Sequence, residues 1–184
     1  MGVVLYGGAF DPPHLGHVAV AAAARERFGA QRLVVLVDER PAHRAVHASA
    51  EDRLTLARAA FPGDDVRLDR HPRTVELLRS ERFDDPVFVI GADQFRNFLS
   101  WCEPAEVLER TRIAVATRPG FPRDQLDEVL SELDRPERVL FFEIEPHPGA
   151  STDVRARVAA GEPLDGLVPA AVARLISERG LYRS

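Results

Sequence analysis

Short runs of consecutive apolar residues recur along the chain, separated by longer stretches in which apolar positions return every three or four residues. A strand that is covered on both faces of a parallel sheet shows such an unbroken apolar run, whereas a half-exposed strand alternates. We therefore predict buried strands at residues 3–6, 33–37, 87–90, 113–116 and 139–142, and a weaker strand at residues 66–68.

The stretches between these runs carry helix signals. Ser49 and the acidic pair that follows Ala50 resemble a capping signal. Gly29, Gly161 and Gly180 are placed as C-terminal stops. We predict helices at residues 16–28, 74–82, 124–133, 152–160 and 169–179, and one that starts after Ser49.

The alternation of strands and helices predicts an α/β fold: a single doubly wound Rossmann-like domain over residues 1–184, with a mostly parallel sheet and two C-terminal helices. In open α/β sheets, ligands bind at the carboxyl ends of the strands, near the point where the strand order reverses. Residues 7–18, residues 91–93 and Arg118 each follow a predicted strand, so we expect them to contribute to the binding site.

The composition narrows the functional classes. A net charge of −5 argues against general nucleic-acid binding, which needs a basic face to neutralise phosphates. No run approaches the roughly 20 apolar residues of a membrane span, and Met1 leads into a strand rather than a signal sequence. We therefore expect a cytoplasmic protein that does not bind membranes. A homo-oligomer is compatible with all of these features.

Two residue types restrict the chemistry further. The single cysteine, Cys102, excludes an internal disulfide and a thiolate zinc cluster, and beside Trp101 it is expected to be a small buried side chain. The chain contains no lysine. Any anion site must therefore use arginine, histidine or backbone amides.

The stretch GGAFDPPHLGHV, directly after the first predicted strand, combines features of a phosphate site. Gly7 and Gly8 allow a backbone path that other residues avoid and let a ligand approach closely, and Gly16 leaves the first helical turn uncrowded. His14 and His17 share a face if the turn between them is helical, and a helix N-terminus adds free N–H groups. Histidines there can donate hydrogen bonds to charge that develops on a phosphoryl group.

Other site types fit this stretch less well. A P-loop needs a lysine after its glycines, a dinucleotide fingerprint needs the spacing G-x-G-x-x-G, and a zinc pair needs histidines four residues apart around a glutamate. The stretch has none of these features. A tight turn with incidental histidines is the remaining alternative.

The same stretch resembles the G-G-x-F-D-P-x-H-x-G-H signature of the nucleotidylyltransferase superfamily, whose H-x-G-H element binds a nucleotide triphosphate. Near the other end of the chain, ASTDVRARV resembles the second signature of that superfamily, I-S-S-T-x-I-R, with matches at Ser151, Thr152 and Arg155. The resemblance implies that this second element opens a helix whose N-terminus and arginine hold the phosphates of ATP. A serine or threonine that begins a helix, with a cation one turn later, fits that role.

Four further stretches resemble the bacterial nicotinate-nucleotide adenylyltransferase family: RPAHR, VFVIGADQF, SWCEPAEVLERTRIAVATRPGF and the ending ISERGLYR. The likeness implies transfer of the adenylyl group of ATP to nicotinate mononucleotide, which gives deamido-NAD and pyrophosphate in NAD biosynthesis. ATP and a pyridine mononucleotide are the implied partners. The implied cofactor is Mg2+, carried mainly by the ATP phosphates, with no metal site on the protein.

The resemblance also implies roles for individual residues. His17 would meet the α-phosphate of ATP, and His14 and Arg155 the phosphates that leave. The implied ATP-binding residues are Gly7, Gly8, Ala9, Phe10, Gly16, Gly91, Asp93, Ser151 and Thr152. The implied substrate-binding residues are Arg44, Arg73, Thr74, Trp101 and Arg118.

Arg73 departs from the family pattern in a way that bears on the substrate. It replaces the aromatic residue of the usual S-Y-T, in a segment that surrounds the pyridine ring in the family. We hypothesise that Arg73 pairs with the nicotinate carboxylate and so favours the acid over the amide, with a solvated surface arginine as the alternative. A second departure is Gly149-Ala150 where Ile-Ser is usual, so the preceding strand is expected to end differently.

Alternatives stay open at the level of residues and of function. Arg44 could be an exposed loop arginine, Asp93 a helix cap and Trp101 a core side chain. An enzyme that adenylylates nicotinamide mononucleotide or phosphopantetheine, or a cytidylyltransferase, would keep both phosphate elements and change the acceptor pocket. A non-catalytic nucleotide-binding regulator would have lost a histidine or the second arginine, and this chain retains all three.

Overall fold

A computed structural model describes residues 2–41, 45–122 and 124–183. Its sheet has six strands in the order β3-β2-β1-β4-β5-β6, and every pairing between them is parallel. The strands are β1 (Val3–Gly8), β2 (Arg32–Asp38), β3 (Asp65–Asp69), β4 (Pro86–Gly91), β5 (Arg112–Thr117) and β6 (Val139–Glu143). All six predicted strands are confirmed, including the weak one.

Strand β1 lies at the centre of this sheet. Val3 pairs with Arg32 of β2 on one side and with Pro86 of β4 on the other, so the strand order reverses between β1 and β4. The crevice at the carboxyl end of such a switch point is where open α/β sheets bind ligands. The loop that follows β1 therefore starts at the position where a ligand site is expected.

The helices alternate with the strands as predicted. They are α1 (Leu15–Arg27), α2 (Ala50–Ala60), α3 (Thr74–Ser80), α4 (Ala92–Arg96), α5 (Pro104–Arg110), α6 (Asp124–Ser131), α7 (Ser151–Ala160) and α8 (Ala170–Arg179). Helices α4 and α5, of five and seven residues, were not predicted. Two single-turn helices, Phe98–Ser100 and Pro136–Arg138, complete the secondary structure of the described residues.

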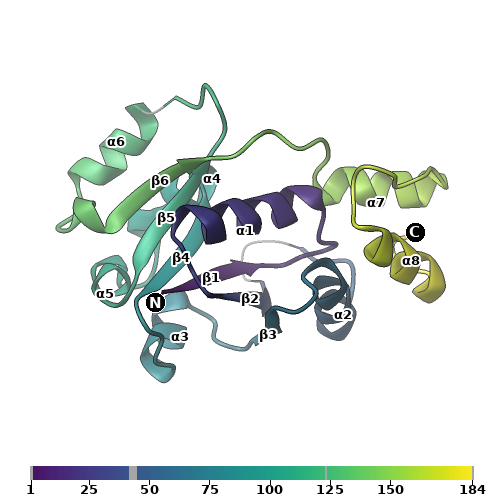
Figure 1. Ribbon diagram of the computed structural model, residues 1–184, viewed down its shortest axis with the longest axis horizontal. Helices are drawn as coiled ribbons and strands as arrows, with labels where there is room; N and C mark the ends of the chain where they lie inside the picture. The colour runs from purple at the N-terminus through teal and green to yellow at the C-terminus, as the bar shows by residue number, and fades with distance from the viewer. Residues whose placement is uncertain (1, 42–44, 123, 184) are drawn as a thin grey trace.

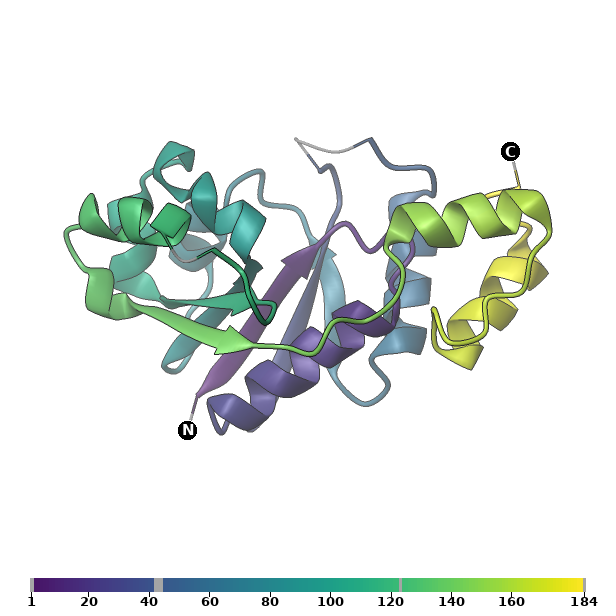
Figure 2. The same ribbon diagram turned by 90° about the horizontal axis from the view of Figure 1, so that it is seen from above.

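The helices cover the two faces of the sheet (Figure 1). One buried cluster joins Val35 of β2 to Ala24 of α1, Leu56 of α2 and Ile176 of α8. The other, on the opposite face, joins strand residues to α3, α4, α5 and α6. Figure 2 shows the resulting three layers from above. This explains the unbroken apolar runs, because both faces of the central strands are buried.

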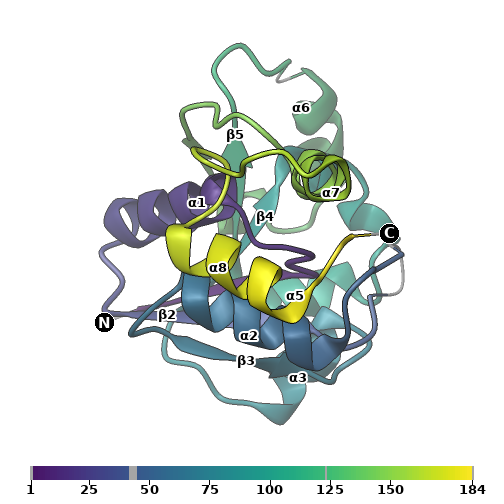
Figure 3. The ribbon, with the colours of Figure 1, turned by 90° about the vertical axis from the view of Figure 1, so that its right-hand side faces the viewer.

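The two C-terminal helices lie beyond the carboxyl end of β1, as Figure 1 shows. Helix α8 rests on α2 (Figure 3), where Arg179 donates a hydrogen bond of 2.7 Å to Asp52. The end of the chain is thereby placed next to the loop between β1 and α1. In the part of the chain that the structure describes, no helix combines the length and apolar character needed to cross a membrane.

Candidate active site

The region between β1 and the first turn of α1 holds two imidazoles in contact, with their ring planes tilted by 39°. His14 is the N-cap of α1, and its Nδ1 accepts the backbone N–H of Gly16 at 3.1 Å. The Nδ1 of His17 accepts the backbone N–H of His14, also at 3.1 Å. The two ring centroids lie 3.8 Å apart. The predicted proximity of the two histidines is therefore confirmed.

These hydrogen bonds fix the protonation of both rings. A ring nitrogen that accepts an N–H cannot carry a proton itself, so the neutral tautomer in each ring has its proton on Nε2. Burial lowers the pKa of His14 from 6.5 to about 4, and His147 adds to this lowering while the Asp153 carboxylate opposes it. His14 is thus a neutral Nε2–H donor at physiological pH.

The amides of the first turn of α1 were expected to be free for an anion, and the structure shows otherwise. Leu15 donates its N–H to the Leu167 carbonyl at 2.8 Å, Gly16 donates to His14, and His17 donates to the His14 carbonyl at 2.9 Å. The donors that this helix end presents are therefore side-chain Nε2–H groups. The helix dipole still contributes its positive end.

The glycines of the loop act through close packing rather than through an unusual backbone. Gly7 and Gly8 lie within β1, and neither has a positive φ. The prediction that they adopt a backbone conformation that other residues avoid is therefore wrong for both. The residue in the left-handed region is Phe10, with φ 49°. Gly16 is needed for a different reason: a Cβ there would lie 2.9 Å from the His14 ring.

Helix α7 brings the second predicted element to this loop. The Arg155 Nη1 donates to the backbone oxygen of Asp11 at 2.6 Å, across 144 positions of sequence, and its Nη2 donates to Thr152 Oγ1 at 3.3 Å. Ser151 Oγ donates to the Pro12 carbonyl at 2.8 Å. The imidazoles and the guanidinium are therefore attached to the same loop, as both signatures together predicted.

Helix α7 begins at Ser151, as expected, but Ser151 is not the residue that caps it. The N-cap is Ala150, and its N–H is accepted by Asp153 Oδ2 at 2.7 Å. Ser151 holds the loop instead of capping the helix. The chain reaches this point through Gly149, with φ 85°, where an isoleucine would be strained.

Asp93 follows β4 and is open to solvent. Gly91 is the N-cap of α4, and its N–H is accepted by the side chain of Gln94 at 3.1 Å. The Asp93 carboxylate is 81% exposed and pairs with Arg96 at 2.9 Å. Asp93 does not cap the helix, and its carboxylate lies exposed just beyond the carboxyl end of β4.

The residues predicted to surround the pyridine ring come together at the start of α3. Arg73 is the N-cap of that helix, with Thr74 next to it, and the Arg73 Nη1 donates to Cys102 Sγ at 3.2 Å. Trp101, adjacent to Cys102, packs on Phe98 with ring centroids 5.2 Å apart. Cys102 is half-buried, so the expectation of a fully buried side chain is wrong.

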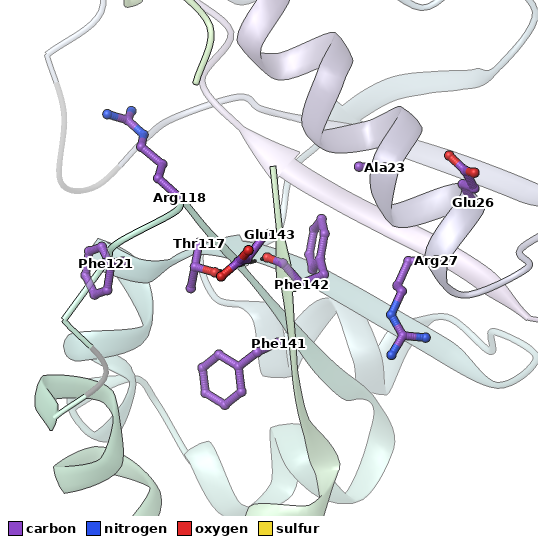
Figure 4. Close-up of a pocket in the computed structure, with 9 residues that line it drawn as sticks. All are labelled: Ala23, Glu26, Arg27, Thr117, Arg118, Phe121, Phe141, Phe142 and Glu143. Atoms are coloured by element: carbon purple, nitrogen blue, oxygen red, sulfur yellow. Dashed lines mark hydrogen bonds between the residues drawn. The ribbon is translucent and has the colours of Figure 1, made fainter. Parts of the chain in front are cut away.

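A hollow of about 770 Å³ lies beside Arg118, between α1 and the edge of the sheet. Figure 4 shows Arg118 and Arg27 on opposite sides of it, with Phe141 and Phe142 of β6 between them. None of its lining residues comes from the loop between β1 and α1 or from the start of α7. Arg118 follows β5 and is exposed. Arg44, another predicted substrate residue, and His43 lie outside the described residues.

Four residues of this region were missed by the sequence analysis. Tyr182 donates a buried hydrogen bond to Asp11 beneath the loop, and the buried Arg53 donates to the Ala9 carbonyl of the same loop. His147 lies beside the first turn of α1, since a Cβ on Gly16 would be 3.6 Å from the Cβ of His147. None of these contacts has a local signal, because each joins residues far apart in the chain.

The described residues also bear on metal binding. Among residues 2–41, 45–122 and 124–183, no group of three or more histidine, cysteine or acidic side chains is arranged to hold a metal ion.

Comparison with known proteins identifies the family. The profile of the cytidylyltransferase-like family matches residues 5–157. A Rubrobacter xylanophilus protein named "Probable nicotinate-nucleotide adenylyltransferase" is 35% identical over 199 aligned positions, covering 100% of this chain and 93% of that protein. A Thermus thermophilus protein of the same name is 35% identical, with 100% of both chains covered. The chain belongs to the nicotinate-nucleotide adenylyltransferase branch of the cytidylyltransferase-like family. The family resemblance of the motifs is thereby confirmed.

Solved structures agree with the family's fold. A Plasmodium falciparum nicotinic acid mononucleotide adenylyltransferase complexed with NaAD superposes with a TM-score of 0.73 at 15% identity, covering 98% of this chain and 96% of that one. The same Plasmodium enzyme complexed with APC gives a TM-score of 0.71. At this identity the likeness concerns the fold, and it confirms the predicted Rossmann-like architecture for this member of the family.

Proposed function

We propose that this protein transfers the adenylyl group of ATP to nicotinate mononucleotide, giving deamido-NAD and pyrophosphate. The observation that carries the proposal is the meeting of two Nε2–H imidazoles with Arg155 on one loop at the switch point of the sheet. The family of the chain supports the same reaction.

The chemistry asks little covalent work of the protein. An oxygen of the 5′-phosphate of the mononucleotide attacks the α-phosphorus of ATP in line, and the bond between that phosphorus and the bridging oxygen breaks as pyrophosphate leaves. Such a transfer gains its rate from positioning and from charge stabilisation. The described site accordingly offers hydrogen-bond donors and a cation at one loop, which are the groups that this chemistry uses.

Each hydrogen-bond donor of the site is proposed to bind a particular phosphate of ATP. His17 donates from Nε2 to the α-phosphate, while His14 and Arg155 donate to the phosphates that leave. Thr152 accepts from Arg155 with its hydroxyl oxygen, so its hydroxyl hydrogen can be donated to a phosphate. The remaining ATP contacts come from the loop of Gly7, Gly8, Ala9, Phe10 and Gly16, from the start of α4 at Gly91 and Asp93, and from Ser151.

The divalent cation that nucleotidyltransferases use is proposed to be Mg2+, bound by the triphosphate of ATP. Carbonyl, phosphate and water oxygens are the ligands that this ion prefers, and it keeps several waters. When bound, it would neutralise part of the phosphate charge. The roles of His14, His17 and Arg155 derived above do not depend on its position.

The mononucleotide side is proposed to involve Arg73, Thr74, Trp101, Arg118 and Arg44. The contact of Arg73 with Cys102 holds its guanidinium next to Trp101, which supports a pyridine site at this point. A guanidinium there favours a nicotinate carboxylate over a neutral amide.

Arg73→Ala should therefore reduce the preference for nicotinate over nicotinamide mononucleotide, measured as the ratio of the two kcat/KM values. An unchanged ratio would reject this role for Arg73.

The reaction is tested by pyrophosphate release from ATP in the presence of nicotinate mononucleotide, nicotinamide mononucleotide or phosphopantetheine. The turnover rate is expected to be higher with nicotinate mononucleotide than with either of the other two acceptors. In the same assay, the His17→Ala variant should show a kcat lower by about a hundredfold or more, as expected for the loss of one transition-state donor. Silence with both pyridine nucleotides and turnover with phosphopantetheine would overturn the proposal. Binding of ATP with no turnover on any acceptor would indicate a regulator.

A further inference from the structure

The carboxylate of Asp11 is the centre of a buried group that joins distant parts of the chain. Asp11 is 4% exposed. Its Oδ2 accepts the N–H of His47 at 2.7 Å and contacts the His47 ring at 3.3 Å, and its Oδ1 accepts the N–H of Ala48 at 3.0 Å. Tyr182 Oη donates to the same Oδ1 at 2.8 Å. A carboxylate with this many donors is tightly held.

Arg53 of α2 makes a second set of contacts at the same place. Its side chain is fully buried. Its Nη1 donates to the carbonyls of Ala9 at 2.8 Å and Asp38 at 2.7 Å, its Nη2 to the Glu39 carbonyl at 3.0 Å, and its Nε to the Ala48 carbonyl at 3.3 Å. Burial lowers the pKa of Arg53, while the Asp11 charge opposes this.

Together these contacts attach the described parts of the segment 39–48, residues 39–41 and 45–48, to the loop between β1 and α1. Arg53 donates to the carbonyls of Glu39 and Ala48, and Asp11 accepts the N–H groups of His47 and Ala48. Ala9 and Asp11 belong to the loop that carries the imidazoles. The segment from 39 to 48 contains the RPAHR stretch, which is the proposed contact of the mononucleotide.

Tyr182 closes this group from the end of the chain. It has φ 61°, a conformation that a bulky residue adopts only when its surroundings hold it there. Burial and the neighbouring Asp11 charge raise the pKa of its hydroxyl, so the hydroxyl keeps its proton and donates. The same Asp11 residue receives Arg155 on its backbone oxygen.

We propose that Asp11, Arg53 and Tyr182 form a positioning hub. The hub holds the loop between β1 and α1, which is proposed to bind the triphosphate, and the segment after β2, which is proposed to bind the mononucleotide, at the separation that in-line attack requires. The inference rests on the proposed adenylyl transfer and deepens it by assigning positioning residues that do not touch either substrate. Since the reaction has no covalent enzyme intermediate, its rate depends on the relative placement of two bound substrates, and small displacements are costly.

Tyr182→Phe tests the hub by removing one hydroxyl and keeping the ring. We expect kcat to fall about tenfold while the KM values for ATP and for the mononucleotide change by less than about twofold, because each loop still binds its substrate but the two are misplaced relative to each other. The matched control is Arg179→Gln, which removes a hydrogen bond between α8 and α2 without touching Asp11. The control should keep the wild-type kcat.

Assays are run well below the melting temperature of each variant, so that the loss of kcat cannot come from unfolded protein. A wild-type kcat in Tyr182→Phe overturns the hub. So does an equal loss of kcat in Arg179→Gln, because any weakening of the C-terminal docking would then have the same effect.

A second measurement does not need activity. Amide hydrogen exchange of the ATP-free protein should be faster in Tyr182→Phe at His47, Ala48 and residues 9–11 and 14, and unchanged there in Arg179→Gln. Unchanged exchange in Tyr182→Phe overturns the hub. If the wild-type protein releases no pyrophosphate with pyridine mononucleotides, the proposed function fails, and the positioning role of the hub fails with it. If the wild type turns over and exchange in Tyr182→Phe is unchanged, the hub alone is overturned.

Discussion

At the scale of single residues, the site is organised by backbone groups that fix side-chain chemistry. His14 and His17 each give one ring nitrogen to a backbone N–H, so the other nitrogen is the donor. Burial lowers the pKa of His14, the Asp153 carboxylate opposes this shift, and His147 adds to it. At His14 the site thus uses a neutral donor, beside the permanent cation of Arg155.

The first prediction concerns the titration of His14. Its pKa is lowered from 6.5 to about 4, so the ring should stay neutral, with its proton on Nε2, from neutral pH down to about pH 5. The unfolded chain binds the proton first, so this group's contribution to stability is complete above about pH 6.5 and declines as the pH falls toward 4. Long-range nitrogen–proton NMR correlations of the imidazole give the tautomer and the midpoint. A midpoint near 6.5 would contradict this.

The second prediction separates activity from stability at Gly16. A Cβ at this position would lie 2.9 Å from the His14 ring, so Gly16→Ala must displace the ring and break its contact with the Gly16 amide. Alanine is favoured over glycine in a helix by about 1 kcal/mol, which offsets the lost contact. We expect kcat/KM to fall about tenfold or more with little change in the free energy of unfolding. An alanine variant of normal activity would show that the ring orientation is not needed.

What the sequence could predict at this scale follows from distance along the chain. His14, Gly16 and His17 lie within one turn, so their spacing alone indicated a shared face. Asp11 and Tyr182 are 171 positions apart, and a tyrosine near the end of a chain carries no sign of its partner. Arg53 looked like any arginine of a surface helix, whereas the fold buries it completely.

At the scale of elements, burial decided which predictions succeeded. The central strands are covered on both faces, and uninterrupted apolar runs report this directly. The weaker strand β3 lies at the edge of the sheet, where only Val66 is buried. Helix α4 spans only Ala92–Arg96, so its sequence read as a loop after β4. The cap of α7 was missed because Asp153 reaches back to Ala150, while Ser151 serves the loop instead.

The third prediction concerns the turn that positions α7. Gly149 has φ 85°, and a Cβ there would lie 2.8 Å from Leu167, whose carbonyl accepts the N–H of Leu15. Gly149→Ala should therefore destabilise the protein by about 2–4 kcal/mol, from backbone strain and overpacking together. It should also raise the KM for ATP, because α7 and the start of α1 both move. Urea unfolding and steady-state kinetics measure the two effects.

Gly161 provides the control for this variant. It ends α7 with φ 69°, yet a Cβ there would meet nothing within 4 Å. Gly161→Ala should thus cost only the backbone term, about 1–2 kcal/mol, and leave the KM for ATP unchanged. Equal effects of the two substitutions on stability and on KM would show that Leu167 does not transmit the strain to the site.

At the scale of the whole molecule, the two ends of the chain complete one site. Arg155, Ser151 and Tyr182 reach the loop after β1 from the last third of the chain, and the hub joins that loop to α2 and β2. Such an arrangement makes the C-terminal helices part of the candidate site. It predicts that they do not unfold on their own.

The fourth prediction is that residues 1–184 unfold as one cooperative unit, as expected of the single domain read from the sequence. Trp101 is the only tryptophan, and it packs on the face of the sheet opposite α8. Its fluorescence and the helical far-ultraviolet signal should therefore give coincident urea transitions. ATP at about 100 times its Kd should shift both together by roughly 2.7 kcal/mol. An earlier far-ultraviolet transition, with the fluorescence unchanged, would mean that α7 and α8 detach while the rest of the fold persists, and that the site can come apart without global unfolding.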